Sequence, residues 1–207
     1  GVWQEFPELE TRAPALLLLA ARLRHEEGAV IGRDGASVCL RVLPLRFVNS
    51  ERLTAFVRHE LAHACDMLDP EFGYAIAHAP TLAQSNRLAE CYHTLWCASV
   101  DARMVRRASA PYHSRDEHYR AFDMCFAARS DAARAALFEK FWSAERTSHA
   151  EILKIAREIE ATSRSLRIPG ARCPLCRFPT HQWAAEIAPR VAALIRADFA
   201  EWRDEDG

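Results

Sequence analysis

Long hydrophobic runs, a strong net charge and an excess of glycine or proline are all missing from this sequence. The longest uncharged apolar run covers residues 13–21, well short of the roughly 20 residues of a membrane-spanning helix. The formal net charge is -1, so charge points to neither a nucleic acid nor an acidic membrane surface as partner. Half of the 207 residues are hydrophobic, which is typical of a folded globular protein.

A secretory leader is not expected either, because no basic segment precedes the apolar run and no small-residue cleavage signal follows it. Seven cysteines are spread over the chain with one close pair. A chain of this length does not need a disulfide scaffold. We therefore expect a cytoplasmic protein without a membrane segment, whose oligomeric state the sequence does not indicate.

The first part of the chain is expected to contain a helix and a small sheet. Residues 12–27 have the pattern of a core helix, with Thr11 as N-cap and Gly28 as its stop. After it, Asp34-Gly35 lies between two short β-favouring runs, and this dipeptide is a strong signal for a two-residue hairpin. Some sheet should therefore precede the next helix.

The remaining sequence is mainly helical. Apolar residues at helical spacing predict a helix over residues 51–68, capped by Asn49 or Ser50 and ended by Pro70. We divide the chain into a main domain, 1–168, and a C-terminal segment, 169–207, that packs on it. Further helices are predicted over residues 81–107, 115–128, 130–166 with a break near Ser143, and 182–202. The expected fold class is α+β, mainly α.

The helix over residues 51–68 contains His59-Glu60-Leu61-Ala62-His63, the HExxH pattern. Residues four apart project from one helix face, so both imidazoles can bind the same ion. Zinc accepts such nitrogen donors and keeps one position open in catalytic sites. Glu60 would then act as general base toward a metal-activated water.

Residues 29–69 resemble the zincin metallopeptidases, in which a short sheet packs on the HExxH helix. The resemblance covers about a fifth of the chain and identifies no subfamily. It implies a small sheet or hairpin on this helix, a helical bundle beside it, Zn²⁺ bound by His59 and His63, and Glu60 as catalytic residue.

The sequence does not decide which residue is the third protein ligand of the metal. The metzincin pattern would use Asp69, and a more distant histidine could only be His78. The gluzincin pattern uses a carboxylate on a second helix, where Glu90, His93, Cys97 and Asp101 share one polar stripe. We favour Asp101, and expect Arg103 to bind substrate or a carboxylate. Asp66 is either a hydrogen-bond partner of a ligating imidazole or a surface aspartate.

A second metal site is possible at Cys173 and Cys176, which have the spacing that lets two thiolates bind one zinc ion. His181, Cys125 or His149 could complete it, and the alternative is two free thiols or a redox pair. For the isolated histidines His113, His118 and His149 we expect only solvent-facing or hydrogen-bonded roles.

The sequence thus favours a zinc-dependent hydrolase acting on a peptide or protein substrate. One alternative is a zincin-like metalloprotein without activity, in which a fourth protein ligand closes the metal site and the surface binds a partner. Another is a metal-dependent enzyme with a substrate other than a peptide.

Overall fold

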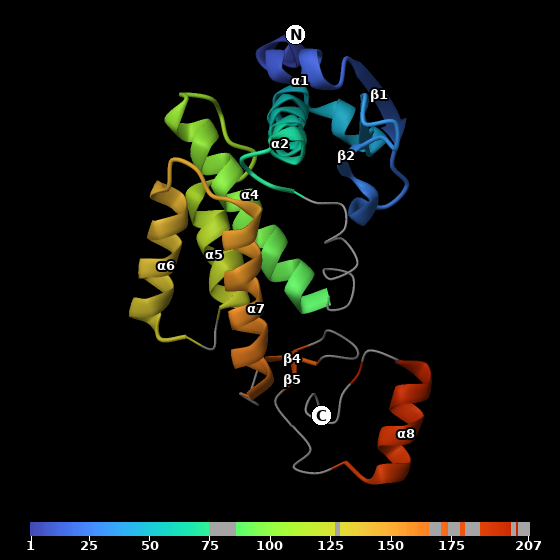
Figure 1. The fold of residues 1–207 in the computed structure, drawn as a ribbon, viewed down its shortest axis with the longest axis vertical. Coiled ribbons are helices and arrows are strands. Elements are labelled where there is room, and N and C mark those ends of the chain that lie inside the picture. Colours follow the sequence, from blue (N-terminus) through green and yellow to red (C-terminus); the bar gives the residue numbers. More distant parts are fainter. Residues whose placement is uncertain are drawn as a thin grey trace.

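We describe the protein from a computed structural model, which describes residues 1–74, 86–126, 129–165, 171–173, 179–180, 187–199 and 202. It is an α+β fold with mainly helical content and a three-stranded sheet, as the coarse class predicted. In Figure 1 the sheet and α2 lie at one end of the long axis and α8 at the other, with the helices α4 to α7 between them.

The described elements, with short 3-10 turns omitted, are α1 (Pro7–Arg12), β1 (Ala15–Ala20), β2 (Gly28–Ile31), β3 (Ser37–Val42), α2 (Ser50–Leu68), α4 (Asn86–Arg106), α5 (Arg115–Cys125), α6 (Asp131–Ser143), α7 (His149–Ser165), β4 (Ala171–Arg172), β5 (Pro179–Thr180) and α8 (Pro189–Asp198).

The sheet has the order β1-β3-β2, with β1 parallel and β2 antiparallel to β3. A hairpin at Asp34-Gly35 is confirmed, since β2 and β3 flank these residues and Gly35 has φ 67°. Its connection covers residues 32–36 and is longer than the two-residue loop that the dipeptide predicts. Positive φ carries no steric cost for glycine, which explains the residue at this turn.

The helix predicted over residues 12–27 is wrong, because residues 15–20 form β1 instead. Four successive leucines have neither a helical nor an alternating pattern, so periodicity alone cannot separate a helix from a strand. Pro14 favours an extended neighbour, and the amide of Ala15 bonds to the carbonyl oxygen of Ala36. Pairing with β3 thus decides the conformation.

The other helices occur close to where the sequence predicts them. Asn49 caps α2 by accepting a hydrogen bond from the amide of Arg52, and Ser114 and Ser130 cap α5 and α6 in the same way. Residues 81–85 and the boundary at 168–170 lie outside the described residues. The division into 1–168 and 169–207 therefore stays a prediction, as does the packing of the C-terminal segment on the first domain.

Two hydrophobic cores lie on either side of α2. One joins α2 to the sheet and α1 through buried residues such as Leu9, Val38 and Leu61. The other fills the bundle of α4 to α7, and Ala62 of α2 contacts both. The HExxH helix is therefore held between a sheet and a second helix, α4, and side chains on its bundle side meet those of α4.

Candidate metal centre

Two histidines of α2 lie one turn apart and point at a common position. Their side chains are buried, with 2% exposure for His59 and 4% for His63. Their Nε2 atoms are 3.1 Å apart, and the rings meet edge to face. Both rings therefore direct the same nitrogen to one place, as the i, i+4 spacing predicts.

Cys97 of α4 completes a group of three. Its Sγ lies 3.6 Å from Nε2 of His63, and one ligand atom from each of His59, His63 and Cys97 falls within 4.8 Å of the others. All three side chains are buried. We call these residues the His-His-Cys group, and it could hold a metal ion.

Asp101, the residue favoured as third ligand, lies on the other side of His59. Its Oδ1 accepts hydrogen bonds from Nδ1 of His59 at 2.8 Å and from the amide of Tyr112 at 3.1 Å. Its Oδ2 accepts from Nε2 of His118 at 2.7 Å and from the amide of His113 at 3.0 Å. The structure therefore places Cys97 beside the two Nε2 atoms and uses Asp101 to fix the His59 ring.

Charges around the His-His-Cys group reinforce one another. Burial raises the pKa of Asp101, but hydrogen bonds from His118 and His59 outweigh this effect and lower it. Burial lowers the pKa of His59, but the hydrogen bond to Asp101 outweighs this effect and raises the pKa well above its usual value. The pKa of Cys97 falls well below its usual value despite burial, because His93 and His63 stabilise the thiolate. A thiolate is the form of cysteine that binds metal ions.

Glu60 points to the sheet side of α2. Its Oε2 accepts a hydrogen bond from the amide of Ala29 on β2 at 2.9 Å. A cavity of ≈ 280 Å³ opens there, with Glu60, His63, His93 and Trp96 in its lining and residues 25–30 on the strand side. Glu60 and one histidine of the group therefore line the same cavity.

Asp66 makes different contacts from those predicted. It accepts hydrogen bonds from Nε1 of Trp96 at 2.7 Å and from both terminal nitrogens of Arg103. No hydrogen bond to His59 or His63 is formed, because the carboxylate is taken up by these two partners on α4. Arg103 does bind a carboxylate, as predicted, and the ion pair between Arg103 and Asp66 joins α4 to α2. Trp96 then packs edge to face on His63.

The remaining candidates for third ligand are placed away from the group or outside the described residues. Asp69 forms an ion pair with Arg146 and caps the end of α2. Glu90, partly buried on α4, is not part of the group that could hold a metal. His78 lies outside the described residues.

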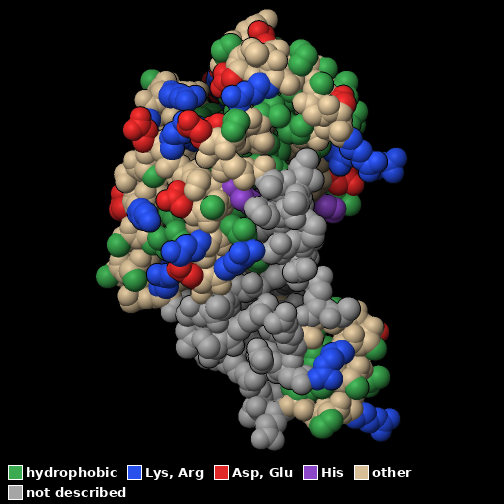
Figure 2. Space-filling model, in the orientation of Figure 1, with side chains coloured by type: hydrophobic (Ala, Val, Ile, Leu, Met, Phe, Trp, Pro, Cys, Tyr) green, Lys and Arg blue, Asp and Glu red, His purple; other side chains and the backbone are tan. Residues whose placement is uncertain are grey.

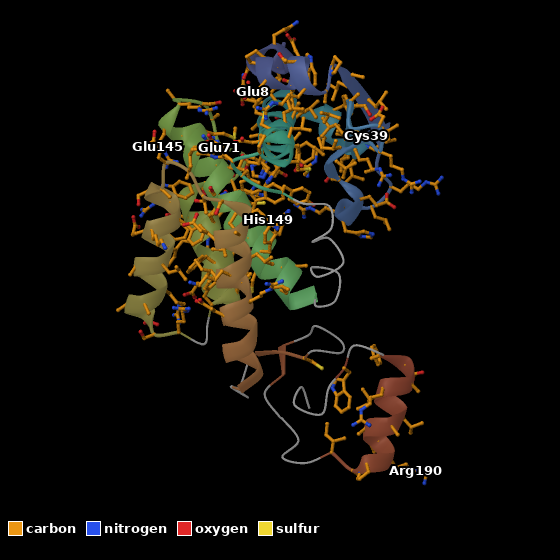
Figure 3. All side chains as sticks on the ribbon, in the orientation of Figure 1. Glu8, Cys39, Glu71, Glu145, His149 and Arg190 are labelled. Atoms are coloured by element: carbon orange, nitrogen blue, oxygen red, sulfur yellow. The ribbon has the colours of Figure 1, made fainter. Side chains whose placement is uncertain are left out.

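The second predicted metal site cannot be assembled from the described residues. Cys173 is partly buried, and Cys176 and His181 lie outside them. Two other residues considered for this site lie in the bundle. Nδ1 of His149 is 2.6 Å from the hydroxyl of Tyr92, and Sγ of Cys125 is 3.4 Å from Oγ1 of Thr94. Figure 3 shows His149 at the start of α7.

Sequence reasoning gave no role at this site to His118, which lies on α5 and reaches Asp101 from the opposite side to His59. Its isolated position carried no signal, since the link to Asp101 is tertiary. For His93, whose pKa is raised to about 9 chiefly by the charge of Cys97, the signal was the polar stripe on α4. Both of its ring nitrogens lie 3.5 Å from Sγ of Cys97.

No match was found in comparisons with family models, curated proteins or solved structures. No helix in the described part of the chain has the length and apolarity needed to cross a bilayer.

Proposed function

We propose that this protein is a zinc-dependent hydrolase, and that its substrate is a peptide or a protein. The observation that carries the proposal is the convergence of the His-His-Cys group beside a cavity that Glu60 and His63 both line. The packing of a short sheet on the HExxH helix agrees with what the zincin resemblance implies.

Two of the distances between donor atoms in the group fit zinc. Bonds of about 2.05 Å to nitrogen and 2.3 Å to sulfur at tetrahedral angles separate two nitrogens by about 3.3 Å, and nitrogen from sulfur by about 3.6 Å. The two Nε2 atoms are 3.1 Å apart, and Sγ of Cys97 is 3.6 Å from Nε2 of His63. Two imidazoles and one thiolate form a donor set that binds zinc in preference to calcium or magnesium.

A bound zinc ion would supply Lewis acidity, both lowering the pKa of water and polarising a substrate carbonyl. The chain supplies the rest. Asp101 holds the His59 ring with Nε2 turned to the group. Glu60, which lines the same cavity as His63, would take a proton from water at its free oxygen and return it to the leaving amine. His93, in the same cavity, can donate a hydrogen bond to the substrate.

The free edge of β2 supports a peptide as substrate. Among the described strands β2 pairs only with β3, and the amide of Ala29 points away from β3 toward Glu60. Glu60 occupies the amide of Ala29, but an extended segment lying along this edge could form hydrogen bonds with the remaining outward-facing main-chain groups of β2. Backbone recognition of this kind requires an amide chain, which a non-peptide substrate lacks.

The test begins with metal analysis of the purified protein, followed by a screen with quenched fluorescent peptides. We expect about one zinc per chain and cleavage that Glu60→Gln abolishes without loss of the metal. Glu90→Gln, a matched change on α4, should leave cleavage intact. Absence of bound zinc after reconstitution, or unchanged turnover in Glu60→Gln, would refute the proposal. Cleavage of esters but not peptides would favour a different substrate.

A closed, non-catalytic metal site is the second candidate, and the position of His93 favours it. Both ring nitrogens of His93 lie 3.5 Å from Sγ of Cys97, so this residue is the candidate for a fourth ligand. X-ray absorption at the zinc edge counts the donors, and His93→Ala separates the two cases. A closed site should lose zinc affinity strongly in this variant, whereas an open site should keep it.

A further inference from the structure

Tyr112, in the connection between α4 and α5, contacts the candidate metal centre with both its backbone and its ring. Its amide donates a hydrogen bond to Oδ1 of Asp101 at 3.1 Å, the same oxygen that lies 2.8 Å from Nδ1 of His59. Its ring lies beside the ring of His59, with centroids 5.6 Å apart. Tyr112 therefore borders both the imidazole and the carboxylate that orients it.

The hydroxyl of Tyr112 is held by Arg46, which lies in the 3-10 turn Pro44–Val48 ahead of α2. All three nitrogens of this guanidinium are used. Nη1 donates to the hydroxyl oxygen of Tyr112 at 2.6 Å, and Nε and Nη2 donate to the two carboxylate oxygens of Glu27 at 2.5 and 2.7 Å. The guanidinium also lies over the ring of Phe56 on α2, with Cζ 4.1 Å from the centroid. The planar fork of arginine makes these contacts at once, and a lysine ammonium cannot.

The ion pair between Arg46 and Glu27 is nearly enclosed. Figure 2 shows basic and acidic side chains interspersed over the visible surface, where ion pairs contribute little. By contrast, the side chain of Glu27 is only 4% exposed and that of Arg46 18%. Oε1 of Glu27 also accepts a hydrogen bond from the amide of Leu43 at 3.0 Å. Because the pair is bidentate and enclosed, it fixes the position of Glu27.

Glu27 stands two residues before Ala29, whose amide donates to Oε2 of Glu60 at 2.9 Å. The backbone between them runs close to the same carboxylate, since a Cβ added at Gly28 would lie 3.4 Å from Oε2 of Glu60. The position of Glu27 therefore governs the amide that holds Glu60. Figure 1 shows α2 between β2 and α4, so the contacts of Arg46 extend to both sides of the HExxH helix.

From these contacts we infer that Arg46 is a positioning residue of the proposed hydrolase. Through the hydroxyl of Tyr112 it fixes the Asp101 carboxylate that orients one imidazole of the His-His-Cys group. Through Glu27 it fixes Glu60, the base. The inference rests on the proposed function, because it assigns Arg46 a role in that same site. Arg46 itself is not among the described residues that line the cavity, so it acts on the reaction only through these neighbours.

Tyr112→Phe tests the first of these links by removing one hydroxyl. The ring beside His59 and the amide that donates to Asp101 are both kept. We expect zinc affinity, measured against a competing chelator, to fall about 2–30-fold, the range that single changes along a connected network produce. Tyr92→Phe is the matched control, because the hydroxyl of Tyr92 lies 2.6 Å from Nδ1 of His149 in the bundle. It removes a hydrogen bond of the same length and should leave zinc affinity unchanged.

A double-mutant cycle separates positioning from a general loss of stability. Asp101→Asn removes the orienting carboxylate and should weaken zinc binding about 10–100-fold. If the hydroxyl of Tyr112 acts through Asp101, adding Tyr112→Phe to Asp101→Asn should cost no further zinc affinity. Independent effects would instead multiply.

Arg46→Lys tests the link to Glu60. It keeps a positive charge beside Glu27 but cannot hold Glu27 and Tyr112 together. We expect kcat to fall about 2–30-fold with KM little changed, because Arg46 does not touch the substrate. Arg58→Lys on α2 is the matched control, since Arg58 makes a bidentate but more exposed pair with Glu5, and kcat should be unchanged in it.

The outcomes separate this inference from the proposed function, because zinc affinity is measured without a substrate. A wild-type chain that binds zinc but cleaves no peptide would refute the hydrolase alone, and the loss of zinc affinity in Tyr112→Phe would still support the link through Asp101. The same zinc affinity in Tyr112→Phe and the wild type would overturn the inference. Multiplying effects in the double variant, or an equal fall of kcat in Arg46→Lys and Arg58→Lys, would also overturn it.

Discussion

Replacing Asp101 with asparagine tests the link between the buried carboxylate and the His-His-Cys group. The side chain is fully buried and accepts four hydrogen bonds, two from imidazoles and two from amides. The carboxamide in Asp101→Asn keeps one acceptor oxygen. When that oxygen faces His59, the NH₂ group is turned toward the amide of His113, and two donors then oppose each other.

The cost can be estimated from these contacts. Hydrogen bonds to charged groups contribute about 1.5–3 kcal/mol each, and removing one partner of a buried charged network costs about 3–5 kcal/mol. We expect the metal-free variant to be less stable by about 3 kcal/mol. Loss of an orienting carboxylate usually lowers metal affinity about 10–100-fold, so zinc binding should weaken by that factor.

Urea unfolding of the metal-free protein and zinc titration against a competing chelator measure the two effects separately. Asp66→Asn is the matched control, because Asp66 is equally buried and bound to Arg103 and Trp96, but bonds to neither histidine. The Asp66→Asn variant should be less stable than the wild type but should bind zinc with nearly the same affinity. The reasoning fails if both variants lose zinc equally, or if Asp101→Asn binds zinc like the wild type.

Two further predictions concern the strand that borders the cavity. The hydrogen bond from Arg46 holds the pKa of Glu27 below its ordinary value of 4.5 although burial opposes it. The pair therefore stabilises the fold above about that pH, and the gain should disappear as pH falls through the lower folded-state value; urea unfolding of wild type and Glu27→Gln should converge at acid pH. Gly28→Ala should destabilise by about 1–3 kcal/mol, because φ is 138° there and the new Cβ would lie 3.4 Å from Oε2 of Glu60. Thermal unfolding measures this loss, and an unchanged melting temperature would contradict it.

Local signals predicted most of the elements. The Asp34-Gly35 turn, the caps at Asn49 and Ser114, and the helical apolar stripes are all read within a few residues of the chain. They locate the hairpin and helices that the structure contains. The four leucines of β1 have no such local signal, since their conformation depends on pairing with a strand some twenty residues later. Sequence periodicity therefore failed where a tertiary partner decides.

In the candidate site, too, local spacing predicted some residues, whereas the placement of others depends on tertiary packing. His59, Glu60 and His63 follow from helix geometry, because their spacing lies within one element. The stripe on α4 also follows from periodicity, and it contains both Cys97 and Asp101. Which of the two meets the shared Nε2 position depends on how far α4 is displaced along α2, a quantity set by packing in both cores.

That displacement also explains why both residues of the stripe are used. Cys97 and Asp101 are one turn apart on α4, as His63 and His59 are on α2. Sγ of Cys97 lies beside His63, and the carboxylate of Asp101 lies one turn further along, at Nδ1 of His59. A shift of α4 by one turn would bring the carboxylate to the place of the thiolate and leave His59 without its orienting partner. The pairing of two one-turn spacings thus gives the group a thiolate and a fixed imidazole from the same helix face.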